Sequence, residues 1–139
     1  MESVNPQSLL QVIQAEKINK GGNFTLRSKS SNRDYTYRVS RSSYNNRWYT
    51  HVYVETQYLK FIHLGTYQSG QIMKNRLPVQ TPSAAGIAWL FRQLETGNFG
   101  KIASQAEVMH TGCCLRCGRE LTDAESIRIG LGPTCRSIR

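Results

Sequence analysis

All four cysteines of this 139-residue chain lie in one short stretch near its carboxyl end, HTGCCLRCGRELTDAESIRIGLGPTC. Cys114 and Cys117 have the C-x2-C spacing that lets two thiolates and the backbone amides between them surround one ion. Gly118 follows directly, and glycine permits the tight turn of a zinc knuckle. Cys135 ends a second turn, Gly-Pro-Thr, and supplies a third thiol. The stretch therefore predicts a metal site.

A structural zinc site takes four ligands, and two residues are candidates for the fourth. Cys113 is adjacent to Cys114, and two neighbouring residues rarely both reach one tetrahedral ion. His110 has three residues between it and Cys114, which lets its imidazole swing back over the knuckle. We therefore predict a structural Zn²⁺ held by three cysteines and one histidine, with Cys113 outside the site. The predicted ligands are His110, Cys114, Cys117 and Cys135.

Disulfides and redox chemistry fit these cysteines less well. Disulfides that stabilise a whole fold join distant segments, whereas these cysteines are clustered. The first residues, MESVNPQSLL, lack the basic and then apolar pattern of an export signal, so we expect a cytoplasmic, reduced chain. A redox-active C-x2-C pair normally stands at the start of a helix, whereas here Gly118 follows the pair and disfavours a helix.

The residues upstream predict an α+β fold that positions this module. We expect an antiparallel meander of about four strands flanked by two helices, because β-branched and aromatic residues alternate between short polar turns. Asn5 and Pro6 suit the start of the first helix, which Gly21 and Gly22 would end, and Ser83 suits the cap of the second. The expected strands are residues 23–29, 34–41, 47–55 and 58–67, the expected helices 5–20 and 83–96, and the expected loop 68–82.

The chain divides by pattern into residues 1–105, an α+β domain, and residues 106–139, a C-terminal zinc-knuckle or treble-clef-like finger. Within the finger, Thr122 and Glu125 have the spacing of a capping box, which predicts a short helix to about Arg128. That helix would turn the chain back and bring the last cysteine to the knuckle. A short strand is expected at 106–109.

A net charge of +9, with 18 basic and 9 acidic residues, favours a polyanionic partner such as nucleic acid. Eight of the basic residues lie in the first 50 positions, interleaved with tyrosines and a tryptophan that suit stacking on bases. The alternative is that the rings face the core and the arginines form a solvated surface. The predicted nucleic-acid or partner surface comprises Arg27, Lys29, Arg33, Arg38, Arg41, Arg47, Arg116 and Arg119.

The sequence does not favour an enzyme. Four protein ligands would leave zinc no open position for water, and the H-x-E pattern of zinc deaminases is absent because Thr111 and Gly112 follow His110. No phosphate-cradling glycine loop, H-E-x-x-H motif or nucleophile elbow is present. His51 and His63 lie in strand patterns without metal-ligand spacing. No apolar run is long enough to span a bilayer, so we expect no membrane partner.

The tail resembles a family found largely in bacteriophage and prophage proteins, whose pattern is approximately H-x-G-x-C-x-x-C-G-R-x-L-T-x-P-x-S-I-x-x-G-x-G-P-x-C. Ala124 stands where proline is usual, and the capping pattern survives that change. The resemblance implies a zinc module and a phage context, and it implies no reaction. The matching residues are His110, Gly112, Cys114, Cys117, Gly118, Arg119, Leu121, Thr122, Ser126, Ile127, Gly130, Gly132, Pro133 and Cys135.

We therefore predict a non-enzymatic zinc-binding protein that binds nucleic acid or a nucleic-acid-processing complex. The phage context suggests an alternative, a phage-encoded inhibitor of a bacterial defence machine, for example an anti-CRISPR protein, that acts by direct protein–protein binding in the host cytoplasm. The chain is too basic to imitate DNA by charge.

Overall fold

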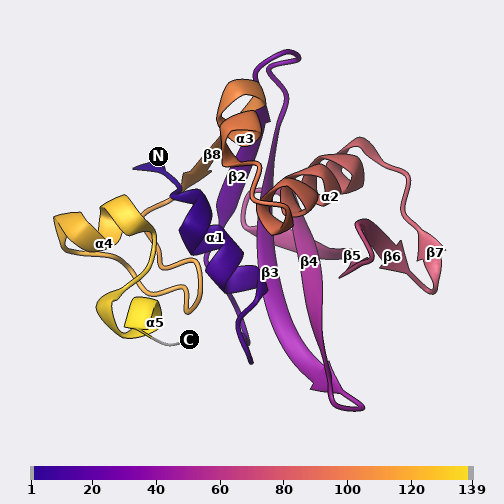
Figure 1. The fold of residues 1–139 in the computed structure, drawn as a ribbon, viewed down its shortest axis with the longest axis horizontal. Helices are drawn as coiled ribbons and strands as arrows, with labels where there is room; N and C mark the ends of the chain where they lie inside the picture. Colours follow the sequence, from indigo (N-terminus) through magenta and orange to yellow (C-terminus); the bar gives the residue numbers. More distant parts are fainter. Residues whose placement is uncertain (1, 138–139) are drawn as a thin grey trace.

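The computed structural model describes residues 2–137 as an α+β fold built on one antiparallel sheet. Figure 1 shows α1 and α2 against one face of the sheet and the cysteine-containing tail beside its end. The strand order across the sheet is β1-β8-β2-β3-β4-β5-β6-β7. The predicted α+β class is confirmed, and the predicted count of about four strands is too low.

The predicted four-strand meander forms the middle of the sheet. Its strands are β2 (Phe24–Ser28), β3 (Asp34–Tyr44), β4 (Arg47–Gln57) and β5 (Lys60–Gln68). Tyr44 pairs with Arg47, so Asn45 and Asn46 alone make the β3–β4 turn. Both asparagines have positive φ, 51° and 62°, as a two-residue turn of this kind requires. Local turn chemistry therefore sets this register.

Strands at both edges extend the meander. The expected loop at 68–82 contains β6 (Gln71–Lys74) and β7 (Leu77–Pro78), joined by two residues with positive φ. At the other edge, β8 (Ala106–His110) lies between β1 (Glu2–Ser3) and β2. The predicted short strand at 106–109 is thus confirmed, and it belongs to the central sheet as well as leading into the tail.

The first helix is shorter than predicted. α1 (Pro6–Ile13) begins at the expected Asn5 cap but ends well before the two glycines. The chain beyond it runs along β3 instead, where Ile18 and Arg41 exchange two backbone hydrogen bonds. Gly21 continues this pairing by donating to the carbonyl of Val39. Pairing with a distant strand has overridden the local helical pattern.

Two further helices cover the same face of the sheet as α1. α2 (Pro82–Glu95) matches the predicted helix, although its capping side chain is Thr81 and not Ser83. α3 (Phe99–Gln105) was not predicted. The core between the helices and the sheet is built from aliphatic and aromatic side chains of both layers. Its largest fully buried members include Leu9, Phe24, Tyr37, Ile87, Leu90, Phe91 and Leu94. None of the described helices is long and apolar enough to cross a membrane.

Candidate metal centre

The C-x2-C pair lies in a small hairpin that follows β8. The backbone N–H of Cys114 donates to the carbonyl of Arg119 at 2.7 Å, and Gly118 donates back to Cys114 at 2.8 Å. Gly118 has a φ of 78°, a left-handed conformation that glycine adopts without strain. Leu121 closes the hairpin by donating to Gly112. The C-x2-C pair thus lies in a tight turn, and we call this hairpin, residues 112–121, the knuckle.

Two short helices bring the third cysteine to the knuckle. α4 (Ala124–Ile129) has the predicted position, but its capping side chain is Asp123, which accepts from Ser126, and not Thr122. Gly130 ends α4 in the left-handed conformation. α5 (Pro133–Ser137) then carries Cys135.

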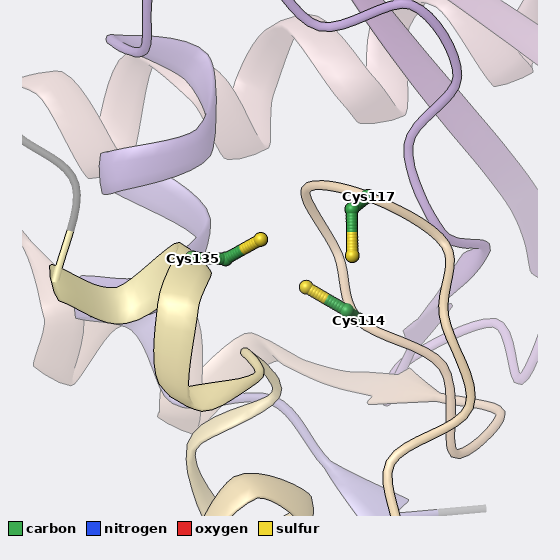
Figure 2. A group of neighbouring side chains, drawn as sticks. All are labelled: Cys114, Cys117 and Cys135. Atoms are coloured by element: carbon green, nitrogen blue, oxygen red, sulfur yellow. The ribbon is translucent and has the colours of Figure 1, made fainter.

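Three sulfur atoms converge in the space between the knuckle and α5. Those of Cys114, Cys117 and Cys135 all lie within 4.8 Å of one another, and Figure 2 shows the three side chains pointing into one gap. Zinc–sulfur bonds of about 2.3 Å in a tetrahedron place sulfurs roughly 3.8 Å apart, so small movements would suffice to bind an ion. Cys114 and Cys135 are buried, and Cys117 is exposed.

The thiols of the group differ in acidity. Burial alone would raise the pKa of Cys114, but backbone N–H groups at Gly132, Cys117 and Arg116 together outweigh it and lower the pKa. Burial raises the pKa of Cys135 to about 12, and hydrogen bonding to the neighbouring thiols adds to the effect. The backbone amides therefore stabilise negative charge at Cys114, as a thiolate ligand requires.

The structure does not bring His110 to the sulfurs, so it brings together three of the four predicted ligands. The His110 side chain is fully buried, and its Nε2 lies 2.8 Å from the carbonyl oxygen of Ile127. Its Nδ1 accepts a hydrogen bond from the backbone N–H of Gly112 at 3.0 Å. Both ring nitrogens are thus occupied by backbone groups. In this arrangement His110 links the start of the knuckle to α4.

Cys113 also lies outside the sulfur group, as predicted. It forms an isolated backbone bridge with Glu120 in the knuckle hairpin and is half-buried. It therefore belongs to the same hairpin as the clustered cysteines without sharing their site.

The knuckle is packed against the end of the sheet through two glycines. The N–H of Gly22 donates to the carbonyl of Leu115 at 3.1 Å. A Cβ on Gly21 would lie 2.7 Å from that same oxygen, and one on Gly22 would overlap the carbonyl of Cys114. Sequence reasoning assigned these glycines to a helix end. In the structure they allow the knuckle to approach the sheet closely. No local sequence signal reveals this role, because the contacting residues lie far along the chain.

Comparison with known proteins bears on this tail alone. Residues 104–139 match a family of unknown function, DUF6011. The match spans β8, the knuckle, α4 and α5, so the DUF6011 segment contains the whole sulfur group. No curated protein and no solved structure matches the chain. The family match thus covers the same C-terminal region as the sequence resemblance, and the zinc motif and the phage context stay predictions.

The eight predicted surface cations do not form one patch. Arg41 faces the helices and donates to the carbonyl of Ala15 and the hydroxyl of Thr50, so it is a structural residue. Arg38 lies on the opposite face of the sheet. The others are distributed over the ends of the sheet and the DUF6011 segment. Arg27, Lys29 and Arg33 lie at the β2–β3 end, Arg47 at the β3–β4 turn, and Arg116 and Arg119 in the knuckle.

Proposed function

We propose that the chain is a non-enzymatic nucleic-acid-binding protein whose C-terminal segment is folded around a structural zinc ion. The nucleic-acid part of the proposal is carried by the unneutralised cations. The 18 basic residues outnumber the acidic ones two to one. Among the described residues, carboxylates form ion pairs with Arg27 and Arg128. Cations without carboxylate partners are available to phosphate groups, which attract them at a distance.

The sulfur group supports the zinc part. Thiolate donors select zinc over hard cations such as magnesium and calcium, and the knuckle provides N–H groups around Cys114. The three cysteines would supply three of the four positions of a tetrahedral ion. His110 does not supply the fourth position in this arrangement, because its two ring nitrogens are hydrogen-bonded to the backbone of Ile127 and Gly112. The zinc would then bridge the knuckle and α5, which α4 separates in the sequence.

A structural role suits the small size of this region. Short segments of this kind commonly fold only with their metal, because zinc binding contributes free energy that a small core does not. We assign no reaction to the site, since the described residues within the sulfur group offer no carboxylate or imidazole to act as a general base. The zinc would therefore order a surface and not activate a substrate.

The test is a fluorescence anisotropy titration of zinc-loaded protein with labelled DNA and RNA at 50 and 200 mM salt. We expect binding whose affinity falls steeply with salt, because phosphate contacts release counterions. Absence of binding at the lower salt, or binding that ignores salt, would overturn the proposal. A pull-down from bacterial lysate, split before and after nuclease digestion, adds a second measurement. Partners that all survive digestion would point to a protein target, as expected for an inhibitor of host defence.

A further inference from the structure

One face of the sheet carries a row of aromatic side chains that the core does not use. Residues alternate between the faces of a strand, and the buried Val52 and Val54 of β4 face the helices. Their neighbours in β4 therefore face the other way, as do the residues that pair with those neighbours in β5. We call this set the aromatic band. It comprises Tyr49, His51, Tyr53, Phe61 and His63.

The rings of the band are in contact across the strands. The Tyr53 and His63 rings are 5.3 Å apart at their centroids and meet edge to face. The His51 and His63 rings are 5.8 Å apart. His51 is held in place by Ser42 and Thr66, whose hydroxyls lie 2.9 and 3.3 Å from its two nitrogens. The band is therefore an ordered surface and not a set of isolated side chains.

The band is open to solvent. Figure 1 shows α1 and α2 on the other face of the sheet, where the core lies. His63 is exposed, and the other four members are half-buried by their neighbours in the sheet. Rings that are clustered on an uncovered face of a sheet form a candidate binding surface.

A cation on each neighbouring strand contacts a member of the band. The Arg38 guanidinium carbon, on β3, lies 4.1 Å above the centroid of the Phe61 ring. Lys74, on β6, donates its ammonium proton to the carbonyl of His63 at 3.1 Å. Within residues 2–137, neither cation is in an ion pair with a carboxylate. Glu55, the acidic residue beside Phe61, accepts from the backbone N–H of Leu59 and is engaged by its own turn.

We propose that the aromatic band binds single-stranded nucleic acid, with bases stacked on its rings and phosphates beside Arg38 and Lys74. Flat rings between two cations complement a strand that offers bases and charged phosphates together. Paired bases in a duplex are stacked on one another and cannot offer their faces to a sheet. A duplex is thus excluded by the same geometry that suits a single strand. This inference rests on the proposed function and assigns it a surface and a substrate class.

The experiment compares a labelled 15-nucleotide oligo(dT), the matching oligo(U) and a 15-base-pair duplex in anisotropy titrations of zinc-loaded protein. We expect both single strands to bind more tightly than the duplex. Tyr53→Leu should weaken single-strand binding about 5- to 150-fold, the range for loss of one stacked base. Tyr58→Leu is the matched control, since Tyr58 is 86% exposed in the β4–β5 turn and outside the band.

Further variants separate loss of stacking from loss of fold. Tyr53→Trp keeps a ring and should retain binding, whereas a purely structural role would make it as damaging as leucine. Lys74→Gln should reduce the slope of log affinity against log salt concentration by about one. Arg76→Gln, in the β6–β7 turn, should reduce that slope less. Equal binding of duplex and single strands, or normal binding by Tyr53→Leu, overturns this inference while the proposed function stands. No binding of any nucleic acid overturns both.

Discussion

Gly22 packs directly against the backbone of Cys114, so that a Cβ on this glycine would lie 2.9 Å from the carbonyl carbon of the cysteine and closer still to its oxygen. The contact joins a loop at the end of the sheet to the centre of the proposed zinc site. Because backbone atoms on both sides are held by hydrogen bonds, neither can yield easily. The proposed zinc site therefore depends on its close contact with the sheet.

Gly22→Ala tests that dependence. We expect it to lower the free energy of unfolding by about 1–3 kcal/mol and to weaken zinc binding, because the added methyl group must push the knuckle away. Urea unfolding and a competition titration with a zinc chelator measure the two effects. Gly100→Ala is the control, since Gly100 lies in α3 with nothing within 4 Å of an added Cβ. Equal effects at both glycines would contradict the packing argument.

Loss of a clustered thiol should unfold the tail and spare the sheet. We expect Cys117→Ser and removal of zinc by a chelator to abolish hydrogen-exchange protection in about the last 30 residues, because the ion is proposed to join the knuckle to α5. Cys113→Ser is the matched control, since Cys113 is in the same hairpin but outside the sulfur group. Unchanged protection in the Cys117→Ser protein would rule out a structural metal.

His110 should contribute to stability and not to coordination. We expect His110→Ala to cost about 2–5 kcal/mol, because it leaves a cavity and removes the hydrogen bonds to Ile127 and Gly112. Elemental analysis should still find one zinc per folded chain. X-ray absorption of the original protein should show three sulfurs and no imidazole scattering. An imidazole signal would restore the Cys₃His set predicted from the sequence.

The histidines of the aromatic band make stability depend on pH. Burial lowers the pKa of His51, and burial together with the charges of His51 and Lys74 lowers that of His63. The unfolded chain, with histidine pKa values near 6.5, therefore takes up protons first as pH falls. The free energy of unfolding should therefore decrease as pH falls from about 6.5 through the lower pKa values that the two histidines have in the folded protein.

Urea unfolding of zinc-loaded protein at several pH values between 7.5 and 5 measures this effect. The double variant with His51→Gln and His63→Gln should show a shallower decrease. Thiol protonation is common to both proteins, so the difference between the curves isolates the two histidines. Parallel curves would show that they do not contribute.

Arg41 should act on stability and leave nucleic-acid affinity unchanged. Its guanidinium donates to the carbonyl of Ala15 and the hydroxyl of Thr50, and burial lowers its pKa. Arg41→Met should cost about 1.5–3 kcal/mol in thermal or urea unfolding, the range for hydrogen bonds of a charged group. Arg47 lies at the exposed β3–β4 turn, so Arg47→Gln should cost less stability than Arg41→Met. Unlike Arg41→Met, it should weaken the salt dependence of nucleic-acid binding.

Local patterns predicted the elements that local interactions control. The alternation of β3 and β4, the helix at α2 and the knuckle at Cys114 and Cys117 follow from neighbouring residues, and the structure contains them. The end of α1 was mispredicted because Ile18 pairs with Arg41 across the fold. The ring orientation of His110 depends on Ile127 in the same way. Such contacts join residues whose proximity no single segment encodes.

The position of β8 has a consequence for how the chain folds. β1 and β2 lie on either side of this strand, so β1 and one edge of β2 obtain their partner only after residue 110 has been synthesised. The meander from β2 to β7 needs no such wait, since each strand pairs with the next. The strands from β2 to β7 can thus assemble during translation, while the long-range pairing of β8 with β1 and β2 comes last and slowest.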